Sequence, residues 1–470
     1  MLPLLPQLMQ NDPEPLEVDA PPNEQNANNE VQHIVVENPS IDLDVYANQY
    51  KGIGRLHRLK YVAEVCPSLA VEALKMAIPY VQTTYNVSLY QLLQKRLRDL
   101  SYGAPASAGS IVYDAYWVDT IVQKSDRRLH VLDEQLRSYK STSFKEAIRR
   151  GHEDLAEYYL SCGDLSNALQ FYSRDRDYCT SGEHELKTCL NMIKVFIYMQ
   201  NWGKIMTNIA KVQSSSYFAR EANAQIRTHL SCAAGLAEMQ LKKYKAAAEH
   251  FLNANFDHFE LPEMISANNV AVYGGLCALA TFGRPELRRL LSSQSFKHFL
   301  ELEPQLRDIV VLFHESKYAS CMTLLDEIRD NLLIDMYIAP HVGTLYTQIR
   351  KRAMIQYFSP YMSVYMHKMA MDFNTSVGDL ENEVMQLILD GQIQARIDSH
   401  NKILYAKESD QRSITVERVL ALGKSYQRNT RMLILRAAMR KSGIQVKSDR
   451  SENGSKHNAI LALLNTLNSP

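Results

Sequence analysis

The sequence lacks the short motifs that mark common catalytic and cofactor sites. No Cys-x-x-Cys pair, Gly-x-Ser-x-Gly turn or Gly-x-Gly-x-x-Gly loop occurs, and the 14 histidines include no His-x-His pair. His314-Glu315 is followed by Ser-Lys-Tyr, which is not the spacing of a His-Glu-x-x-His zinc site. Gly423-Lys424-Ser425 is like the end of a phosphate-binding loop, but Arg418 stands where that loop needs its first glycine. The residues therefore predict no catalytic site, metal site or cofactor, and so a protein that is not an enzyme.

Long apolar runs are also missing. No stretch approaches the roughly 20 apolar residues that cross a bilayer, and the opening MLPLLP has no basic residues of the kind that begin a signal peptide. The 7 cysteines are odd in number and unclustered, which favours reduced thiols over a disulfide framework. We therefore expect a protein of the cytoplasm and nucleus without membrane contact.

Charge is balanced overall but unevenly placed. Residues 1–50 hold 9 Asp and Glu and no Lys or Arg, whereas the chain from Gln411 to the end holds 11 Lys and Arg against 3 Asp and Glu. These flanks are either solvated or meet partners of opposite charge. Residues 1–40 are rich in Pro, Asn and Glu, so we predict a disordered acidic tail there, and residues 442–470 predict a mostly disordered end.

Between the flanks, the apolar spacing is helical. It predicts an N-terminal helical region at 41–101, a small-residue linker at 102–112 and helical repeats over 113–340. A pattern like that of tetratricopeptide (TPR) repeats is carried by Leu155, Ala156, Tyr159, Gly163, Ala168 and Tyr172. Aromatic-bearing turns recur at Trp202, Tyr244 and Tyr318. We interpret these aromatics as packing between stacked repeats rather than as ligand-binding residues.

The period of the apolar residues then changes from 3.6 to 2. Ile393, Ala395 and Ile397 alternate with polar residues, a turn follows at 398–401, and Ile403 and Tyr405 alternate on the return. This pattern predicts a β-hairpin. Helices followed by a hairpin indicate a winged helix at 341–408. We expect Ile403, Leu404 and Tyr405 to form an edge strand that a neighbouring protein extends.

A last helix is predicted at 414–441. Its apolar residues recur at helical spacing and form one stripe, made of Val416, Val419, Leu420, Tyr426, Leu433 and Ala437. An exposed stripe of this length needs a partner. It either folds back on the same domain or joins a bundle of helices from other subunits, and these two alternatives stay open. We therefore predict a mostly α fold, made of a TPR-like solenoid, a winged-helix domain and a long C-terminal helix.

Winged helices often read nucleic acid, but the helix expected to do so is acidic. The segment Ser376–Asp390 contains Asp379, Glu381, Glu383 and Asp390 and no Lys or Arg. A phosphate backbone would repel this surface. The basic C-terminal helix leaves weak, non-specific binding open.

Several stretches resemble one known family. These stretches resemble the subunit 1 family of the COP9 signalosome. They are VVENPSIDLDVYANQYKG (35–52), VEALKMAIPYVQTTYNV (71–87), FKEAIRRGHEDLAEYYLSCGDLSNALQFYSRDRDYCTS (144–181) and LILDGQIQARIDSHNKILYA (387–406). Gly203, Gly343 and Gly378 depart from the expected helical pattern, since glycine disfavours helices by about 1 kcal/mol. The resemblance therefore allows a divergent copy.

The resemblance implies a function. Members carry a PCI domain, whose N-terminal part would begin near residue 269. It implies a non-catalytic scaffold subunit that supports removal of Nedd8 from cullin–RING ubiquitin ligases, with catalysis in another subunit and with subunits 2 and 3 as neighbours. The alternatives are the equivalent PCI subunit of the proteasome regulatory lid and a winged-helix nucleic-acid-binding protein.

Overall fold

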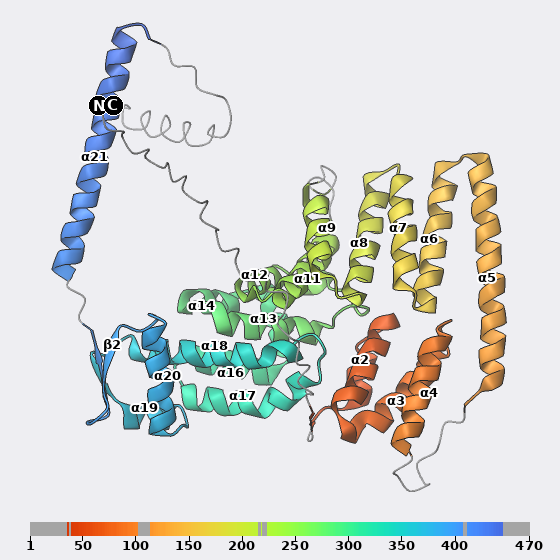
Figure 1. Cartoon of the computed structure of the whole chain (residues 1–470), viewed down its shortest axis with the longest axis horizontal. Helices are drawn as coiled ribbons and strands as arrows, with labels where there is room; N and C mark the ends of the chain where they lie inside the picture. The colour runs from red at the N-terminus through yellow and green to blue at the C-terminus, as the bar shows by residue number, and fades with distance from the viewer. Residues whose placement is uncertain are drawn as a thin grey trace, which may run out of the picture. The chain divides into compact units, whose positions relative to one another are not determined.

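The computed structural model describes residues 35–36, 39–101, 113–214, 218, 223–407 and 411–444. The chain is mostly helical (Figure 1), which confirms the predicted fold class. It divides into two compact units, Met1–Ile393 and Gln394–Pro470. Most of the predicted acidic tail, the 102–112 linker and the end of the chain after residue 444 lie outside the described residues. The predicted domain boundaries stay predictions.

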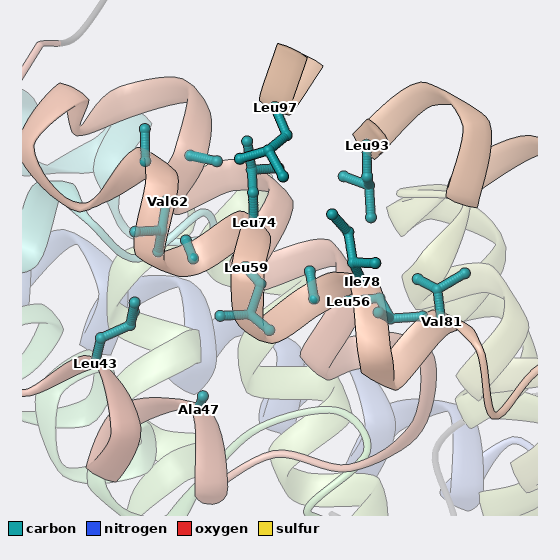
Figure 2. Close-up of a cluster of buried hydrophobic side chains, with 14 of the residues drawn as sticks. Leu43, Ala47, Leu56, Leu59, Val62, Leu74, Ile78, Val81, Leu93 and Leu97 are labelled. Atoms are coloured by element: carbon teal, nitrogen blue, oxygen red, sulfur yellow. The ribbon is translucent and has the colours of Figure 1, made fainter. Parts of the chain in front are cut away.

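The N-terminal region forms a small helical cluster. Its helices are α1 (Leu43–Asn48), α2 (Gly52–Val65), α3 (Pro67–Val81) and α4 (Val87–Ser101). Asp42 begins α1 because its carboxylate accepts the backbone N–H of Asp44, and Pro67 occupies the first turn of α3, where its missing N–H costs nothing. Leu59, Leu74 and Ile78 are fully buried in the shared core of these helices (Figure 2).

A series of helices follows, each packed against the next in the chain. These are α5 (Ala115–Thr142), α6 (Lys145–Cys162), α7 (Leu165–Asp177), α8 (Gly182–Tyr198), α9 (Trp202–Ser214), α11 (Ala224–Gln240) and α12 (Tyr244–Leu252). Gly163 ends α6 with a φ of 85°, a conformation that favours glycine. Tyr244 is buried at the start of α12, which supports a packing role for the aromatic turns.

The next helices form a cluster around α13. They are η2 (Phe256–His258), α13 (Ala267–Thr281), α14 (Arg284–Ser292), α15 (Gln294–Leu302), α16 (Pro304–His314), α17 (Tyr318–Leu333) and α18 (Ala339–Phe358). Helix α13 packs against α12, α15, α16 and α18, so it is buried on all sides. Gly275 allows this close packing, because a Cβ there would lie 2.7 Å from Leu306.

The C-terminal part contains the strands. Its elements are β1 (Ser363–Tyr365), α19 (Met366–Asp372), α20 (Val377–Leu389), β2 (Ala395–Asp398), β3 (Ile403–Ala406) and α21 (Gln411–Lys441). Strands β2 and β3 are antiparallel, with Ile397 opposite Leu404, which confirms the predicted hairpin. The sheet order is β1-β3-β2. Asp398 stabilises the hairpin turn by accepting the backbone N–H groups of His400 and Asn401.

Candidate partner-binding surfaces

Helix α20 stands where a winged helix carries its recognition helix. Nε of Arg350 on α18 donates to both carboxylate oxygens of Glu383, at 2.9 and 3.2 Å. Lys351 donates to Asp390 at 3.4 Å. The acidic residues of α20 therefore pair partly with its own supporting helix. Because α20 contributes no Lys or Arg, it offers little attraction for a phosphate backbone.

The position of the predicted edge strand is wrong. Strand β3 lies between β1 and β2, so Ile403, Leu404 and Tyr405 belong to the central strand. Leu404 is fully buried, and only Tyr405 has a substantially exposed side chain, at 44%. The open edges of the sheet in the described residues are β1 and β2. Whether Ile403, Leu404 and Tyr405 contact a partner stays a prediction.

The sequence analysis did not single out other apolar side chains exposed around the winged helix. They are Tyr361, Met362, Tyr365, Met371, Met385 and Leu389. Tyr361 and Met362 precede β1, Tyr365 ends it, and Met385 and Leu389 lie on α20. Leu389, the last residue of α20, is 72% exposed.

Helix α21 exposes its predicted apolar stripe. Val416, Val419, Leu420, Tyr426 and Leu433 are 51–75% exposed, and Ala437 is also exposed. Leu422, Met432, Ile434 and Leu435 are exposed too, which the prediction missed. Ile434 follows Val416 by about five turns and therefore lies on the stripe, whereas Met432 and Leu435 lie on the other side. The apolar surface of this helix is thus broader than one seam.

A buried ion pair connects the N-terminal region to the helices around α13. Nη1 of Arg58, on α2, lies 3.0 Å from Oδ2 of Asp335, which follows α17. The guanidinium also lies 4.1 Å from the ring centre of Tyr50 and 5.1 Å from that of Tyr337. Burial alone would lower the pKa of Arg58, but Asp335 and the tyrosines outweigh this effect and raise it.

The same core continues through tyrosine hydroxyls. Tyr273 donates to Asp335 at 2.7 Å, and Tyr50 donates to Asn269 at 2.9 Å. Burial raises the pKa of both tyrosines. These hydrogen bonds position the N-terminal region. The sequence pattern could not reveal them because the partners lie far apart in the chain.

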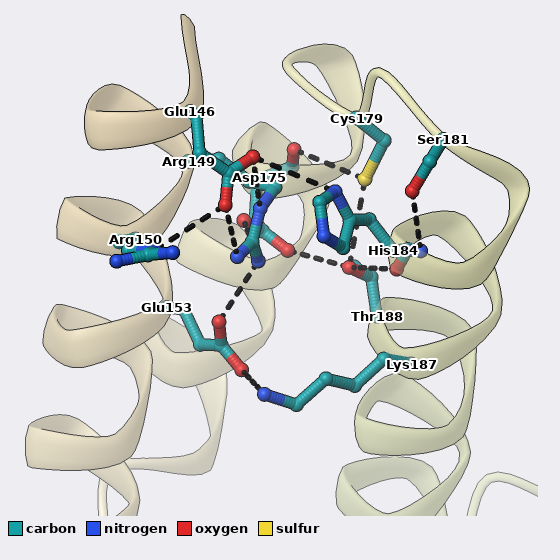
Figure 3. A network of polar contacts seen from close by, with 10 residues as sticks. All are labelled: Glu146, Arg149, Arg150, Glu153, Asp175, Cys179, Ser181, His184, Lys187 and Thr188. Atoms are coloured by element: carbon teal, nitrogen blue, oxygen red, sulfur yellow. Dashed lines mark hydrogen bonds and ion pairs between the residues drawn. The ribbon is translucent and has the colours of Figure 1, made fainter.

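A second polar network joins α6, α7 and α8 (Figure 3). Arg149 donates to Glu153 at 2.8 Å, and its Nη1 lies 3.7 Å from Oδ1 of Asp175. The other oxygen of Asp175 accepts the hydroxyl of Thr188 at 2.5 Å. Burial raises the pKa of Asp175, while the bond from Thr188 opposes this shift. Lys187 completes the network through Glu153, at 2.6 Å. These contacts fix the packing of three neighbouring helices.

The described residues hold no group of three or more His, Cys, Asp or Glu arranged for a metal ion. None of their helices combines the length and apolar character of a bilayer span. The seven cysteines are all free, and five of them are buried. Burial raises the pKa of Cys232 and of Cys277, so these thiols are poor nucleophiles. The exposed apolar side chains around the winged helix and along α21 are candidate contact surfaces for partner proteins.

Three parts of the chain match known families. Residues 114–290 match the family of the 26S proteasome subunit RPN7, and residues 319–408 match the PCI domain. Residues 411–438 match the family described as the C-terminal helix of COP9 signalosome complex subunit 1. The last match covers most of α21.

Relatives are similar over nearly the whole chain. COP9 signalosome complex subunit 1b of Drosophila melanogaster is 65% identical over 98% of this chain and 97% of its own length. COP9 signalosome complex subunit 1 of Arabidopsis thaliana is 37% identical over 88% of this chain and 93% of its own. The 26S proteasome non-ATPase regulatory subunit 6 of Caenorhabditis elegans is 21% identical over 73% of this chain and 86% of its own.

Proposed function

The chain belongs to the COP9 signalosome subunit 1 family, and we propose that it is a non-catalytic scaffold subunit of that complex. In this role it supports removal of Nedd8 from cullin–RING ubiquitin ligases, in the cytoplasm and the nucleus. It holds other subunits in place, with subunits 2 and 3 as neighbours. The chemistry of Nedd8 removal belongs to another subunit.

The observation that carries this proposal is the exposed apolar surface of α21. Five of the six predicted stripe residues have large side chains that are at least 51% exposed. A long helix gains most of its stability from packing an apolar face, so α21 needs a partner. Its match to a C-terminal helix family of a complex subunit favours other subunits of such a complex as that partner.

The sheet edge supports the same role. Strand β2 has β3 on one side and an open edge on the other in the described residues. An open edge can accept a strand from another protein, and this contact uses backbone groups that need no particular side chain. We therefore place the contact with a neighbouring PCI domain at β2.

The proteasome lid is the second candidate. The match of residues 114–290 to the RPN7 family and the similarity to a proteasome regulatory subunit favour it. The stronger similarity to signalosome subunits, 65% against 21% identity, argues for the signalosome. A nucleic-acid-binding function has less support because α20 carries no basic residue.

Affinity purification of the tagged full chain followed by mass spectrometry tests the proposal. We expect signalosome subunits in stoichiometric amounts and no lid subunits. A double variant Val419→Glu/Leu433→Glu on the stripe should recover much less of the complex, because two charges would enter the packed face.

The matched control lies on the same helix. Met432→Glu/Leu435→Glu adds the same charge at residues of similar exposure on the other side. If stripe and control variants recover equal amounts, α21 is not the assembly surface. Recovery of lid subunits in place of signalosome subunits would favour the second candidate.

A further inference from the structure

A cavity of about 350 Å³ lies between the start of α4 and helices α5 and α6. Its wall contains Tyr85, Tyr158 and Tyr159, and two carboxylates, those of Asp126 and Asp164. The remaining lining residues are Val87, Ser88, Val122, Ser125 and Cys162. No Lys, Arg or His lines it among the residues that the structure describes. The cavity thus combines aromatic rings with negative charge.

The rings are held firmly. Tyr85 and Tyr158 have ring centres 6.0 Å apart, and those of Tyr158 and Tyr159 are 5.4 Å apart at an angle of 72°. The hydroxyls of Tyr158 and Ser125 are 2.6 Å apart, which fixes the ring of Tyr158 against α5. Phe171 stacks on Tyr159 at 5.2 Å and supports it from α7. This rigidity lowers the entropy cost of binding.

Close packing between α6 and the α4 start also shapes the cavity. Gly163 has a φ of 85°, and a Cβ there would overlap the amide group of Asn86. Asn86 in turn accepts the backbone N–H of Leu89 at 3.0 Å, in the first turn of α4. Tyr85 is therefore brought beside the end of α6 by a contact that only glycine permits.

The cavity has charge that the chain does not neutralise. Asp126 has no hydrogen bond or ion pair with the described residues. Asp164 accepts the backbone and side-chain N–H groups of Asn167, at 3.1 and 2.7 Å. Burial raises the pKa of Tyr159, and Asp133 and Asp164 raise it further.

At two other tyrosines, an arginine of the same chain lies over the aromatic ring. Arg58 lies over the ring of Tyr50 at 4.1 Å, and Arg55 lies over Tyr80 at 4.9 Å. No cation of the described residues lies over Tyr85, Tyr158 or Tyr159. Cations bind aromatic faces and pair with carboxylates. Asp126 is exposed and therefore accessible to a cation from outside the chain.

We propose that this cavity binds the basic side chain, lysine or arginine, of a peptide segment from a partner protein. The aliphatic stem would pack on the tyrosine rings, and the charged end would meet Asp126 and Asp164. The volume lies within the usual range of ligand pockets and leaves room for more than the side chain alone. The site lies between the N-terminal helices and the first helical repeats, and it does not depend on α21 or the sheet edge.

The test uses the purified full chain and short capped peptides, Gly-Ser-X-Ser-Gly, with X being arginine, lysine or norleucine. Binding is followed by ligand-observed saturation-transfer NMR. We expect the arginine and lysine peptides to bind with dissociation constants in the millimolar range, on the order of a single ion pair with a cation–π contact. The norleucine peptide, which has the stem without the charge, should bind at least about tenfold more weakly.

Two variants probe the cavity, and each has a matched control on α5. Asp126→Asn should weaken binding severalfold, while Asp119→Asn, an exposed residue of the same helix outside the cavity, should not. Val122→Phe should fill the cavity, while Val131→Phe should leave binding unchanged. Val122 and Val131 are both 43% exposed, so neither change should disturb folding.

The outcomes separate the possibilities. Equal binding of the norleucine peptide would reduce the site to an apolar hollow and overturn the proposal. Absence of binding at 10 mM peptide, on the order of the weakest useful affinity, would also overturn it. So would equal effects of the cavity variants and their controls.

Discussion

Nη1 of Arg58 lies 3.0 Å from Oδ2 of Asp335, and the side chains are only 2% and 11% exposed. This contact joins α2 to the turn before α18. The residues between them include the whole helical array, so the N-terminal region is bound to the helices that support the winged helix. Ser40 reinforces the connection by hydrogen bonds with Asn331.

The first prediction concerns this ion pair. Arg58→Met should lower the free energy of unfolding by about 3–5 kcal/mol, because it leaves the buried carboxylate of Asp335 without its counter-charge. The matched control is Arg96→Met, which removes an exposed pair with Glu64 and should cost about 1 kcal/mol or less. Thermal and urea unfolding of the full chain measure both.

A double variant makes this test specific. Arg58→Met/Asp335→Asn should be less destabilised than the sum of the two single changes, because no unpaired charge remains. Simple additivity would contradict the ion-pair argument and leave only the loss of packing.

The second prediction is a pH dependence. Burial lowers the pKa of His152 from 6.5 to about 4, helped by Lys140 and Arg174. Between these values the unfolded chain binds a proton that the folded chain does not, so stability falls as the pH drops from about 6.5 to 4. The contribution is at most about 3 kcal/mol.

Replacement of the histidine isolates this effect. His152 stacks on Tyr178 at 5.6 Å, and its Nδ1 has no hydrogen-bond partner in the described residues. His152→Phe should therefore keep the packing and reduce the loss of thermal stability on acidification. The exposed His130 gives the control for the substitution itself, because His130→Phe makes the same change outside this packed site. Equal slopes for wild type and His152→Phe would reject the prediction.

The sequence predicted those elements whose apolar residues recur with a regular period. The helical spacing and the switch to a period of 2 gave the helical array and the hairpin, because buried faces impose these repeats. The edge strand was placed wrongly because β1 has only 3 residues, too few for alternation to be read. The tertiary partners of Arg58 were also missed. In the segment GIGRLHRLKY, Arg58 has the local pattern of a solvated basic residue. Nothing in the neighbouring sequence indicates that it is buried in an ion pair with Asp335.

The third prediction contrasts two helical glycines. Gly54→Ala should destabilise the protein, because the new Cβ would overlap the carbonyl oxygen of Glu263. Gly203→Ala should stabilise it by about 1 kcal/mol, since nothing lies within 4 Å of its Cβ position and alanine favours a helix. Melting temperatures should shift in opposite directions. A shift of the same sign would show that the close approach at Gly54 is relieved by movement.

The fourth prediction concerns the open edge at β2. Lys407 N–H donates to the carbonyl of Gln394 at 2.9 Å, so the alternating ladder turns the N–H of Ile397 toward the open edge. Ile397→Pro should remove that donor, leave the β2–β3 ladder intact and weaken binding of a neighbouring PCI domain. Ile397→Ala is the control, because it loses the side chain and keeps the N–H.

A proline in the central strand should behave differently. Leu404 is fully buried, so Leu404→Pro should unfold the sheet rather than only block a contact. Circular dichroism separates unfolding from loss of binding, and pull-down of signalosome subunits reports the contact. If Ile397→Pro and Ile397→Ala bind equally well, the neighbour does not extend β2.

The last prediction concerns α21. Truncation after Ser413 removes the whole exposed stripe, from Val416 to Ala437. If the stripe joins a bundle of helices from other subunits, the shortened chain should stay folded, keep its PCI neighbours and enter the complete complex poorly. If the stripe instead packs on its own domain, the shortened chain should lose thermal stability.

Truncation after Ser442 keeps all of α21 and controls for loss of the basic end. Thermal melts and sucrose-gradient sedimentation of the reconstituted complex measure the two effects. A shortened chain that unfolds, or that assembles as well as the control, contradicts the bundle, because a bundle contributes to assembly without contributing to the fold of the free subunit.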